Sequence, residues 1–545
     1  MLRLIFLLIS MMLVASLAQG EPQRDNNRAF QGDAVAEKIH EQCLRLLRQE
    51  SSGGDKATEL LHLRLRRLYA ARNFQPLWTK RRTVAELMQA LEASVADGLN
   101  PADYHLARIR EFDANPTPTP DLKARRDILL TKSFLALATH LRYGKVDPAT
   151  LDPNWNINAG KNFGVFDKKL QQAVEAESVA AVLEELRPHD ASYNALKKAL
   201  ARYRTIVQRG GWRAVPAGET LKAGARSSRM PLLRQRLKLS GDLAPEAADT
   251  VTVYTPELVE AVKRFQRRNG MVADGSVGAG TLRIMNISAT RRVEQLRLNL
   301  DRYRWFLHEI EPTCIVVNIP SYTLHYLENG ALRWEARVIV GQPLRETPIF
   351  KAMMPYIIIN PKWIVPETIM EQDVLPALNK DTAYLNKKKL RVVDEEGTVV
   401  DPASIDWSHY SAANLPYRLQ QGAGDQGALG RIKFMMPNRH TVYLHDTPNR
   451  ELFAKSSRAL SSGCVRVQHP EELARLLLHD SVRWSAAMIQ QSIATEKTRS
   501  VMLAQPVPVY LLYLTAIPNG SGVRFCDDIY NRDAKALKAL NTRMN

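Results

Sequence analysis

The chain has 545 residues, of which 45% are hydrophobic and 24% charged, and this ordinary globular composition excludes a disordered or collagen-like chain. Four cysteines in this length exclude a disulfide scaffold, and the length predicts several domains. Lys and Arg number 75 against 57 Asp and Glu, a net charge of +18 that predicts a polyanionic neighbour. Nucleic acid, acidic lipid and an anionic wall polymer all fit that charge.

The first residues have the three-part layout of a secretory signal. Arg3 precedes an almost wholly apolar run over residues 4–17, and small residues follow at 18–20. The run is shorter than the roughly 20 apolar residues that span a bilayer. We therefore expect a cleaved signal peptide over residues 1–20 and no transmembrane anchor after cleavage. Export also argues against nucleic acid as the partner.

Residues 36–220 are predicted to be a helical scaffold domain. Leucines recur at three- and four-residue spacing, as at Leu61, Leu65 and Leu68, and turn signals at 97–101 and 144–148 separate the helices. This region contains no cluster of acids, bases or nucleophiles, so we expect no chemistry there.

A compact helical unit is expected over residues 221–290. Thr255-Pro256-Glu257 is typical of a helix start, and Asn269-Gly270 of a helix end. A tight turn over 274–282 then leads into another helix. The stretch from Ala261 to Leu282, AVKRFQRRNGMVADGSVGAGTL, resembles the small three-helix peptidoglycan-binding domain found on many wall enzymes. The resemblance implies a peptidoglycan-binding module.

From residue 312 onward the hydrophobic period becomes that of strands. Short β-branched runs occupy 314–319, 336–340, 356–360, 439–444 and 507–513, and residues 471–495 are predicted to be helical. A polar, interrupted segment over 367–428 separates these runs, and we expect it to be a functional insertion. The chain as a whole is thus predicted to be a multi-domain α+β protein whose last domain, 312–545, is mainly β.

One pair of residues in this β domain is predicted to carry chemistry. Cys464 follows Gly463, which lets the backbone bend and approach a substrate closely. The N–H groups of Ser462, Gly463 and Cys464 are expected to converge on a developing oxyanion. His445 ends a predicted strand and supplies a candidate base for the thiol, and Arg466 adds positive charge.

The stretch around these residues resembles the catalytic motif of the YkuD-type L,D-transpeptidases: a His, then Ser-x-Gly-Cys followed by Val-Arg. His445 and Cys464 lie nineteen residues apart, and Ser462 stands where many members of the family carry a second His. Further blocks match at 341–348, 360–366 and 427–434. With the helical scaffold and the binding module, the chain resembles the large periplasmic subgroup of Gram-negative bacteria.

The resemblance implies a reaction that needs no cofactor and no metal. Cys464 attacks the meso-diaminopimelate carbonyl of a tetrapeptide donor stem, D-alanine leaves, and an amine of an acceptor stem resolves the thioester into a 3→3 cross-link. Water or another amine in the second step gives carboxypeptidase or exchange activity, and the motif does not rank these outcomes. The resemblance also implies acylation by carbapenems and a periplasmic location; wall synthases or hydrolases are possible partners.

Three further residues are candidate substrate-binding groups: Tyr443, Trp363 and Arg466. Tyr443 lies two residues before His445 and hence on the same face of a strand. A core Tyr443, and an Arg466 that only braces the loop, are equally open. We expect Asp446 to be structural and the insertion 367–428 to cap the substrate. A backbone carbonyl is one candidate for the group that holds the His445 ring, and the sequence does not identify that group.

Several alternatives stay open at this point. A zinc site is conceivable from His440, His445, Cys464 and His469, although five residues of predicted strand would turn the first two to opposite faces. A non-catalytic wall-binding scaffold and a serine hydrolase at Ser461 or Ser462 are the others. The pairing of Cys43, Cys314 and Cys526 is undetermined, and the last two are expected to be buried.

Overall fold

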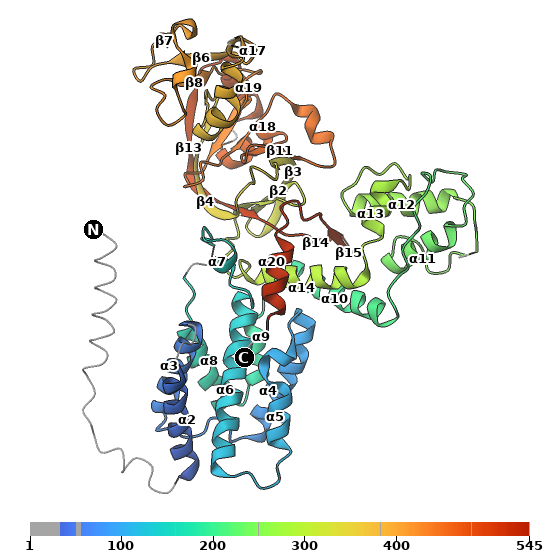
Figure 1. Ribbon diagram of the computed structural model, residues 1–545, viewed down its shortest axis with the longest axis vertical. Coiled ribbons are helices and arrows are strands. Elements are labelled where there is room, and N and C mark those ends of the chain that lie inside the picture. Colours follow the sequence, from blue (N-terminus) through green and yellow to red (C-terminus); the bar gives the residue numbers. More distant parts are fainter. Residues whose placement is uncertain are drawn as a thin grey trace.

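The computed structural model describes residues 33–543 apart from 51–55, 158–159, 249, 382, 481 and 521. The predicted signal peptide over residues 1–20 lies outside these residues. Figure 1 shows three parts: a helical bundle in blue, a small helical module in green, and a sheet domain in yellow to orange. Within the described ranges, no helix is long and apolar enough to cross a membrane. The predicted α+β organisation is confirmed.

The bundle consists of antiparallel and crossing helices around one apolar core. Its longest helix, α6, starts at the Thr119 cap and ends at Gly144, and the buried carboxylate of Asp127 within it accepts hydrogen bonds from Tyr69 Oη and Trp78 N. The helices are α2 (Ala34–Glu50), α3 (Lys56–Ala70), α4 (Arg81–Ala93), α5 (Leu106–Asp113), α6 (Pro120–Tyr143), α8 (Gly164–Glu175) and α9 (Val179–Glu185). The short helix α7 (Pro148–Leu151) packs instead through Leu151 in a separate small cluster with Val146 and Trp305.

Two further helices belong to the core of the sheet domain. In α10 (Ala191–Gln208), the buried residues Tyr193, Leu196 and Leu200 share a core with the strands and with α14 (Ala289–Arg304). The fully buried Arg304 of α14 links the two helices, because it donates a hydrogen bond to Tyr193 Oη of α10 at 2.7 Å. Its charge is paired with Asp301 of the same helix at 2.8 Å. Helix α10 lies within the predicted scaffold region 36–220, and its buried face packs against the core of the sheet domain.

The module between these two helices contains α11 (Met230–Ser240), α12 (Pro256–Arg268) and α13 (Ala279–Met285). Thr255 Oγ1 caps α12 by accepting from Leu258 N, and Gly270 follows its end with a φ of +70°, as the sequence predicted. Leu258 and Phe265 lie in the module's own core. The three helices therefore form a separate small domain.

The sheet domain is built on nine strands in the order β11-β3-β12-β10-β9-β4-β13-β1-β2, and β2 also pairs with β3, so the ring of strands closes. The pairs β1–β13, β10–β12 and β11–β3 are parallel. The strands are β1 (Cys314–Asn318), β2 (Thr323–Glu328), β3 (Ala331–Gly341), β4 (Phe350–Ile359), β9 (Ile432–Met435), β10 (Leu444–His445), β11 (Ala459–Ser461), β12 (Val465–Val467) and β13 (Arg499–Leu512).

Two predicted elements differ from the structure. Only the end of the expected strand 439–444 is a strand, because the Asn438 side chain accepts from the N–H groups of His440 and Val442 and bends the chain there. The expected helix 471–495 is two helices, α18 (Pro470–Leu478) and α19 (Ala486–Ala494), because His479 adopts a φ of +48° and Ser485 caps a new helix.

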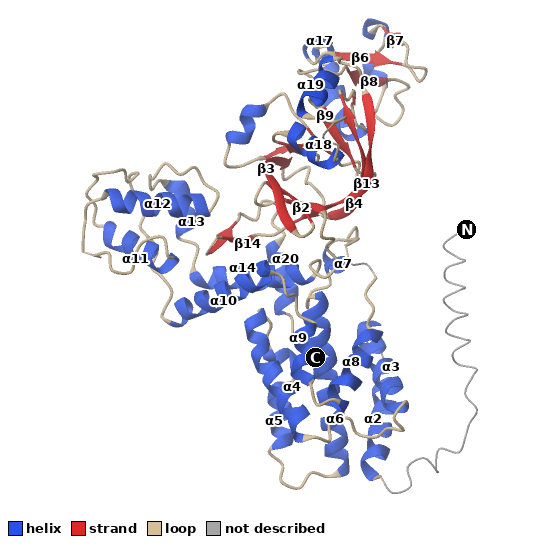
Figure 2. Ribbon diagram, turned by 180° about the vertical axis from the view of Figure 1, so that it is seen from behind, coloured by secondary structure: helices blue, strands red, loops and turns tan. Residues whose placement is uncertain are grey.

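The predicted insertion is a small unit with its own core, including Val365, Val392, Trp407 and Leu419. It lies at the end of the sheet domain remote from the bundle (Figures 1 and 2). Its elements are α15 (Glu367–Ile369), a short π-helix (Met370–Val374), α16 (Leu375–Leu378), α17 (Tyr384–Lys387), β6 (Leu390–Val393), β7 (Val399–Val400) and β8 (Arg418–Gln421). The preceding strand β5 (Trp363–Ile364) lies before the predicted start of the insertion and pairs with β8. The chain then ends with the hairpin β14 (Ala516–Asn519) and β15 (Gly522–Phe525), and with α20 (Asp533–Asn541).

Candidate active site

The candidate residues meet on one face of two neighbouring parallel strands. In the register of β10 with β12, His445 lies opposite Arg466, and Val465 N donates to Tyr443 O at 3.1 Å. Because side chains alternate along strands, Tyr443 and His445 share a face with Cys464 and Arg466. The structure thus brings Cys464 beside Tyr443. His445, two residues further along its strand, lies diagonally across the strand pair from Cys464.

The turn that carries Cys464 is held by side-chain hydroxyls. Ser461 Oγ donates to Cys464 O at 2.6 Å, and Thr347 Oγ1 donates to Gly463 O at 2.8 Å. Gly463 has a φ of +113°, which disfavours any residue with a Cβ. Its N–H donates to Ser461 Oγ at 3.2 Å. Of the three N–H groups expected at an oxyanion, that of Gly463 therefore has an acceptor already, and those of Ser462 and Cys464 remain.

The Cys464 thiol is only partly exposed and lies 3.9 Å from Thr441 O. Burial raises the pKa of this thiol, whereas hydrogen bonding from Tyr443 and the charges of Lys433 and Arg466 lower it. Burial has the larger effect, so Cys464 rests as a thiol that a base must deprotonate. The surrounding cations then favour the thiolate once it forms.

His445 is buried, and its Nδ1 is hydrogen-bonded to the backbone carbonyl of Asp446. A carbonyl only accepts, so Nδ1 carries the proton and Nε2 keeps its lone pair. Burial, with smaller effects from Arg466 and Lys433, lowers the pKa of His445 to about 3. The imidazole is therefore neutral, which a proton acceptor requires. The Asp446 carboxylate instead accepts from Arg431 N at 2.9 Å.

Tyr443 connects Cys464 to Trp363, which lies next to the insertion. The Tyr443 and His445 ring centroids lie 5.6 Å apart. The Tyr443 hydroxyl has hydrogen-bonding contacts with the side chains of Cys464 and of Trp363 on β5, and burial, the larger effect, raises the pKa of Tyr443. The structure therefore places all three sequence-predicted aromatic and thiol groups at one site.

Two residues of the site were not singled out in the sequence. Lys433 on β9 lies opposite His445, and its Nζ is 3.8 Å from the centroid of the Tyr443 ring. Arg345 links the turn to the insertion, because it hydrogen-bonds Ser462 Oγ at 3.0 Å and pairs with Asp373. Lys433 falls within the matched block 427–434, a signal that was available. Arg345 falls within the matched block 341–348, but its partners are distant in sequence, so the block did not reveal its role.

The alternative sites lack the groups that they need. Within the described part of the chain, no three His, Cys, Asp or Glu side chains are grouped as metal ligands. His440 lies in the bent segment before β10, and His469 begins α18, so these two do not extend a strand with His445. The Ser461 and Ser462 hydroxyls are engaged by Cys464 O and Arg345.

The other cysteines are free and buried, as expected for Cys314 and Cys526. Burial raises the pKa of Cys43 and of Cys314 to about 12, and that of Cys526 to about 11. These thiols are therefore poor nucleophiles at neutral pH, and unlike Cys464, which is partly exposed, they are buried.

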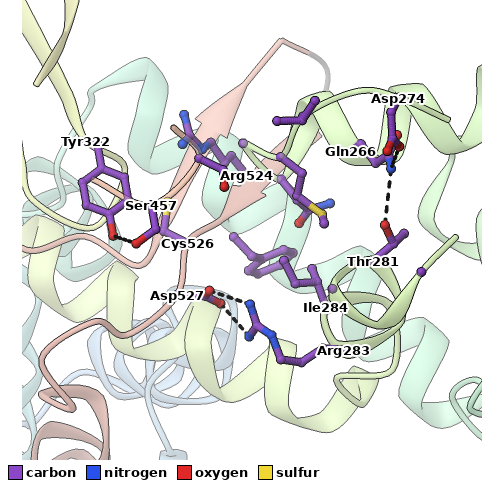
Figure 3. Close-up of a pocket in the computed structure, with 18 of the residues that line it drawn as sticks. Gln266, Asp274, Thr281, Arg283, Ile284, Tyr322, Ser457, Arg524, Cys526 and Asp527 are labelled. Atoms are coloured by element: carbon purple, nitrogen blue, oxygen red, sulfur yellow. Dashed lines mark hydrogen bonds and ion pairs between the residues drawn. The ribbon is translucent and has the colours of Figure 1, made fainter. Parts of the chain in front are cut away.

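A cavity of about 480 Å³ lies where the helical module meets the sheet domain (Figure 3). Gln266, Asp274 and Thr281 form a hydrogen-bonded cluster on the module side, whereas Tyr322 and Ser457 lie on the other. A bidentate ion pair between Arg283 and Asp527 joins the two parts at 2.8 and 3.2 Å. The module thus contacts the sheet domain directly.

Comparisons with known families assign the three parts. Residues 312–501 match the model described as "L,D-transpeptidase catalytic domain". Residues 226–285 match "Putative peptidoglycan binding domain", and residues 64–200 match "Scaffold domain".

One curated protein and one solved structure also match parts of this chain. A protein from Haemophilus influenzae named "Putative L,D-transpeptidase" is 44% identical over 220 residues, which cover 40% of this chain and 44% of the relative. The match therefore spans less than half the length of that relative. A crystal structure of a fused Zn-dependent amidase/peptidase/peptidoglycan-binding domain-containing protein from Clostridium acetobutylicum is 12% identical, covering 54% of this chain and 99% of that chain. Its TM-score of 0.15 supports no argument.

Proposed function

We propose that the protein is a peptidoglycan L,D-transpeptidase that forms 3→3 cross-links, with Cys464 as its nucleophile and His445 as its base and acid. The observation that carries this proposal is the shared face of β10 and β12, where a neutral His445 lies diagonal to Cys464 beside Tyr443. A neutral imidazole next to a protonated thiol is the pair that general-base activation needs.

In the first half-reaction, His445 Nε2 takes the Cys464 proton and the sulfur attacks the meso-diaminopimelate carbonyl of a tetrapeptide stem. The N–H groups of Ser462 and Cys464 stabilise the oxyanion. The C–N bond to D-alanine breaks, D-alanine leaves with the proton from His445, and a thioester remains. In the second half, the side-chain amine of an acceptor stem attacks the thioester, His445 removes its proton, and the Cys464 thiol re-forms.

The unpaired cations of the site support an anionic substrate. Arg466 Nε is buried and has no hydrogen-bond partner among the described residues, and Lys433 forms no ion pair there. Stem peptides carry the carboxylates of D-alanine and of diaminopimelate. We assign Arg466 and Lys433 to these carboxylates, and Tyr443 and Trp363 to the walls around the acyl group.

The insertion acts as a cap in this proposal. Trp363 and Asp373 connect it to Tyr443 and Arg345 at the nucleophile's turn. A closed cap limits the entry of water, which favours amine transfer over hydrolysis of the thioester. Carboxypeptidase and exchange activity remain the second outcome of the same intermediate.

The proposed location is the periplasm of a Gram-negative bacterium, where the module over residues 226–285 holds the enzyme on the wall polymer. Wall synthases or hydrolases are the proposed partners, and carbapenems the proposed inhibitors. Nucleic acid is not a proposed partner.

Intact mass spectrometry after incubation with a carbapenem, and separately with a soluble tetrapeptide, tests the proposal. A single adduct on the wild type that is absent from Cys464→Ala is expected, and His445→Ala should acylate at least a hundredfold more slowly. A folded wild-type protein with a reduced thiol and no adduct from either reagent would leave only the non-catalytic wall-binding role.

A further inference from the structure

The turn that carries Cys464 is held by the connection between β3 and β4. Thr347 Oγ1 accepts a hydrogen bond from Gly341 N at 2.8 Å and donates one to Gly463 O at 2.8 Å, so one hydroxyl joins the end of β3 to this turn. Thr347 and Gly341 are both buried. The connection is tight, because a Cβ at Gly341 would overlap Arg345 O. The position of Thr347 therefore determines where the Gly463 carbonyl points.

The direction of this carbonyl sets the direction of the Cys464 N–H. Gly463 C=O and Cys464 N–H belong to one planar trans peptide unit, in which the oxygen and the hydrogen lie on opposite sides. A rotation of the unit therefore moves both groups together. In the proposed function the Cys464 N–H is one of the two donors to the oxyanion. A fixed Gly463 carbonyl keeps this donor in place before the substrate binds, which is how such donors are most effective.

Tyr530 holds both ends of the connection between β3 and β4. Its hydroxyl donates to Gly341 O at 2.6 Å and accepts from Thr347 N at 3.2 Å. Tyr530 is buried between β15 and α20, outside the residues 312–501 that match the catalytic-domain model. A phenylalanine would fill the same space, so these two hydrogen bonds are what the hydroxyl contributes. The same two residues form the link to Gly463.

Tyr530 is itself held in place by the chain that follows β13. Its N–H donates to Tyr513 Oη at 2.8 Å, and the two rings stack with centroids 5.7 Å apart. Tyr513 Oη in turn donates to Asp528 Oδ1 at 2.6 Å. Two residues after Tyr530, Arg532 pairs with Glu346 of the β3–β4 connection at 2.6 Å. The C-terminal segment therefore contacts this connection at two adjacent points.

We propose that Tyr530 is a positioning residue for the acylation step, acting through Thr347 to aim the Cys464 N–H at the oxyanion. The inference rests on the proposed function for the identity of the reacting group. The Tyr530 hydroxyl is engaged by two backbone groups, so its role is to orient and not to transfer a proton. Because the oxyanion forms only during acyl transfer, loss of this hydroxyl slows that reaction and spares reactions at sulfur that form no oxyanion.

Two reactions of Cys464 in the full chain separate these effects. In acetylation by p-nitrophenyl acetate, the sulfur bonds to the acetyl carbon through an oxyanion, and p-nitrophenolate leaves. Alkylation by iodoacetamide displaces iodide from a saturated carbon and forms no oxyanion. Tyr530→Phe should slow acetylation by about tenfold to a hundredfold, less than the loss of a donor outright, and should be alkylated at the wild-type rate. The rate of Cys464→Ala is subtracted as background.

Thr347 provides a second pair of variants, and another tyrosine provides the control. Thr347→Val removes the hydroxyl at nearly the same shape and should slow acetylation by a similar factor. Thr347→Ser keeps the hydroxyl and should react close to the wild-type rate. Tyr326→Phe is the matched control, because it removes a buried tyrosine hydroxyl of the same domain that hydrogen-bonds His479 Nε2 at 3.2 Å. This variant should be acetylated and alkylated like the wild type.

No Cys464-dependent acetylation of the wild type, or the same rate in Tyr530→Phe, would overturn the proposal. Equal losses of acetylation and alkylation would overturn it as well, because they would mean that Tyr530 only supports the fold around the thiol. So would a Thr347→Ser protein that is as slow as Thr347→Val. Failure of soluble tetrapeptide to acylate a wild type that p-nitrophenyl acetate does acetylate counts against the proposed function alone.

Discussion

Arg345 holds Asp373 through two hydrogen bonds of 2.6 and 2.8 Å, and its Nη1 also hydrogen-bonds Ser462 Oγ at 3.0 Å. Asp373 belongs to the insertion, and Ser462 to the turn that carries Cys464. One guanidinium thus joins the insertion to the turn that carries Cys464. The ion pair raises the pKa of Arg345 and lowers that of Asp373.

Arg345→Met should loosen the cap. Because Asp373 is partly exposed, the ion pair contributes about 1 kcal/mol at most, so we expect up to roughly fivefold more thioester hydrolysis relative to cross-linking. The measurement is the ratio of tripeptide to cross-linked product from soluble tetrapeptide. Arg391→Met, at an exposed position of β6 in the same insertion, should leave the ratio unchanged. If neither substitution changed the ratio, Arg345 would not be the residue that holds the insertion closed.

Lys433→Met should make Cys464 less reactive. Lys433 lowers the pKa of the thiol, so its loss should slow alkylation of Cys464 at pH 8 by roughly tenfold, the effect of one nearby charge. The rate of modification by iodoacetamide, an uncharged reagent, reports this without a substrate. Lys222→Met removes an exposed lysine of the module and serves as the control. An unchanged pH profile in Lys433→Met would refute the electrostatic role.

His445 should contribute to acid sensitivity. Its pKa in the folded chain is about 3 against an ordinary 6.5, so the unfolded chain binds the extra proton below pH 6.5. Stability is therefore fully present above pH 6.5 and is lost as the pH falls towards 3, by about 1.4 kcal/mol per unit.

His445→Gln removes this dependence. The free energy of unfolding of the wild type should fall between pH 7 and pH 5 by about 2 kcal/mol more than that of the variant. Urea denaturation at the two pH values measures the difference. Parallel losses in both proteins would mean that His445 is not neutral in the folded state.

Gly430→Ala should disturb the His445 support. A Cβ at Gly430 would lie 2.4 Å from Asp446 Oδ2, and its φ of +59° costs an alanine roughly 1–2 kcal/mol. Since the Asp446 carbonyl holds His445, both the thermal midpoint and the acylation rate should fall. Gly422→Ala, with open space around it, is the control and should change neither. A stable Gly430→Ala protein with normal acylation would contradict this assignment.

The sequence predicted the parts of the site that are local. Cys464, Gly463 and His445 stand in a short motif, and strand periodicity placed Tyr443 on the face of His445. The structure confirms the α+β organisation and buries Cys314 and Cys526 as expected. The Asp446 carbonyl is the backbone group hydrogen-bonded to the imidazole, one candidate that the sequence left open.

What sequence reasoning missed depends on tertiary packing. The bend at His440 comes from an Asn438 side chain that overrides β propensity. Arg345 meets Ser462 and Asp373 across 117 and 28 residues, which no local pattern reveals. The helical period of residues 191–208 fits a bundle as well as a sheet core, so only the buried contacts of α10 assign it.

Helices α10 and α14 pack against each other, and the module that contains α11, α12 and α13 is inserted between them in the chain. Trp212 Nε1 donates to Ile287 O, and Val215 exchanges two hydrogen bonds with the Asn286 side chain, so the chain leaves and returns at one place. Replacement of this module by one of a different size would therefore leave the packing of α10 against α14 unchanged. A fragment that begins at residue 312, by contrast, lacks both helices and exposes the apolar surface of the sheet that they cover.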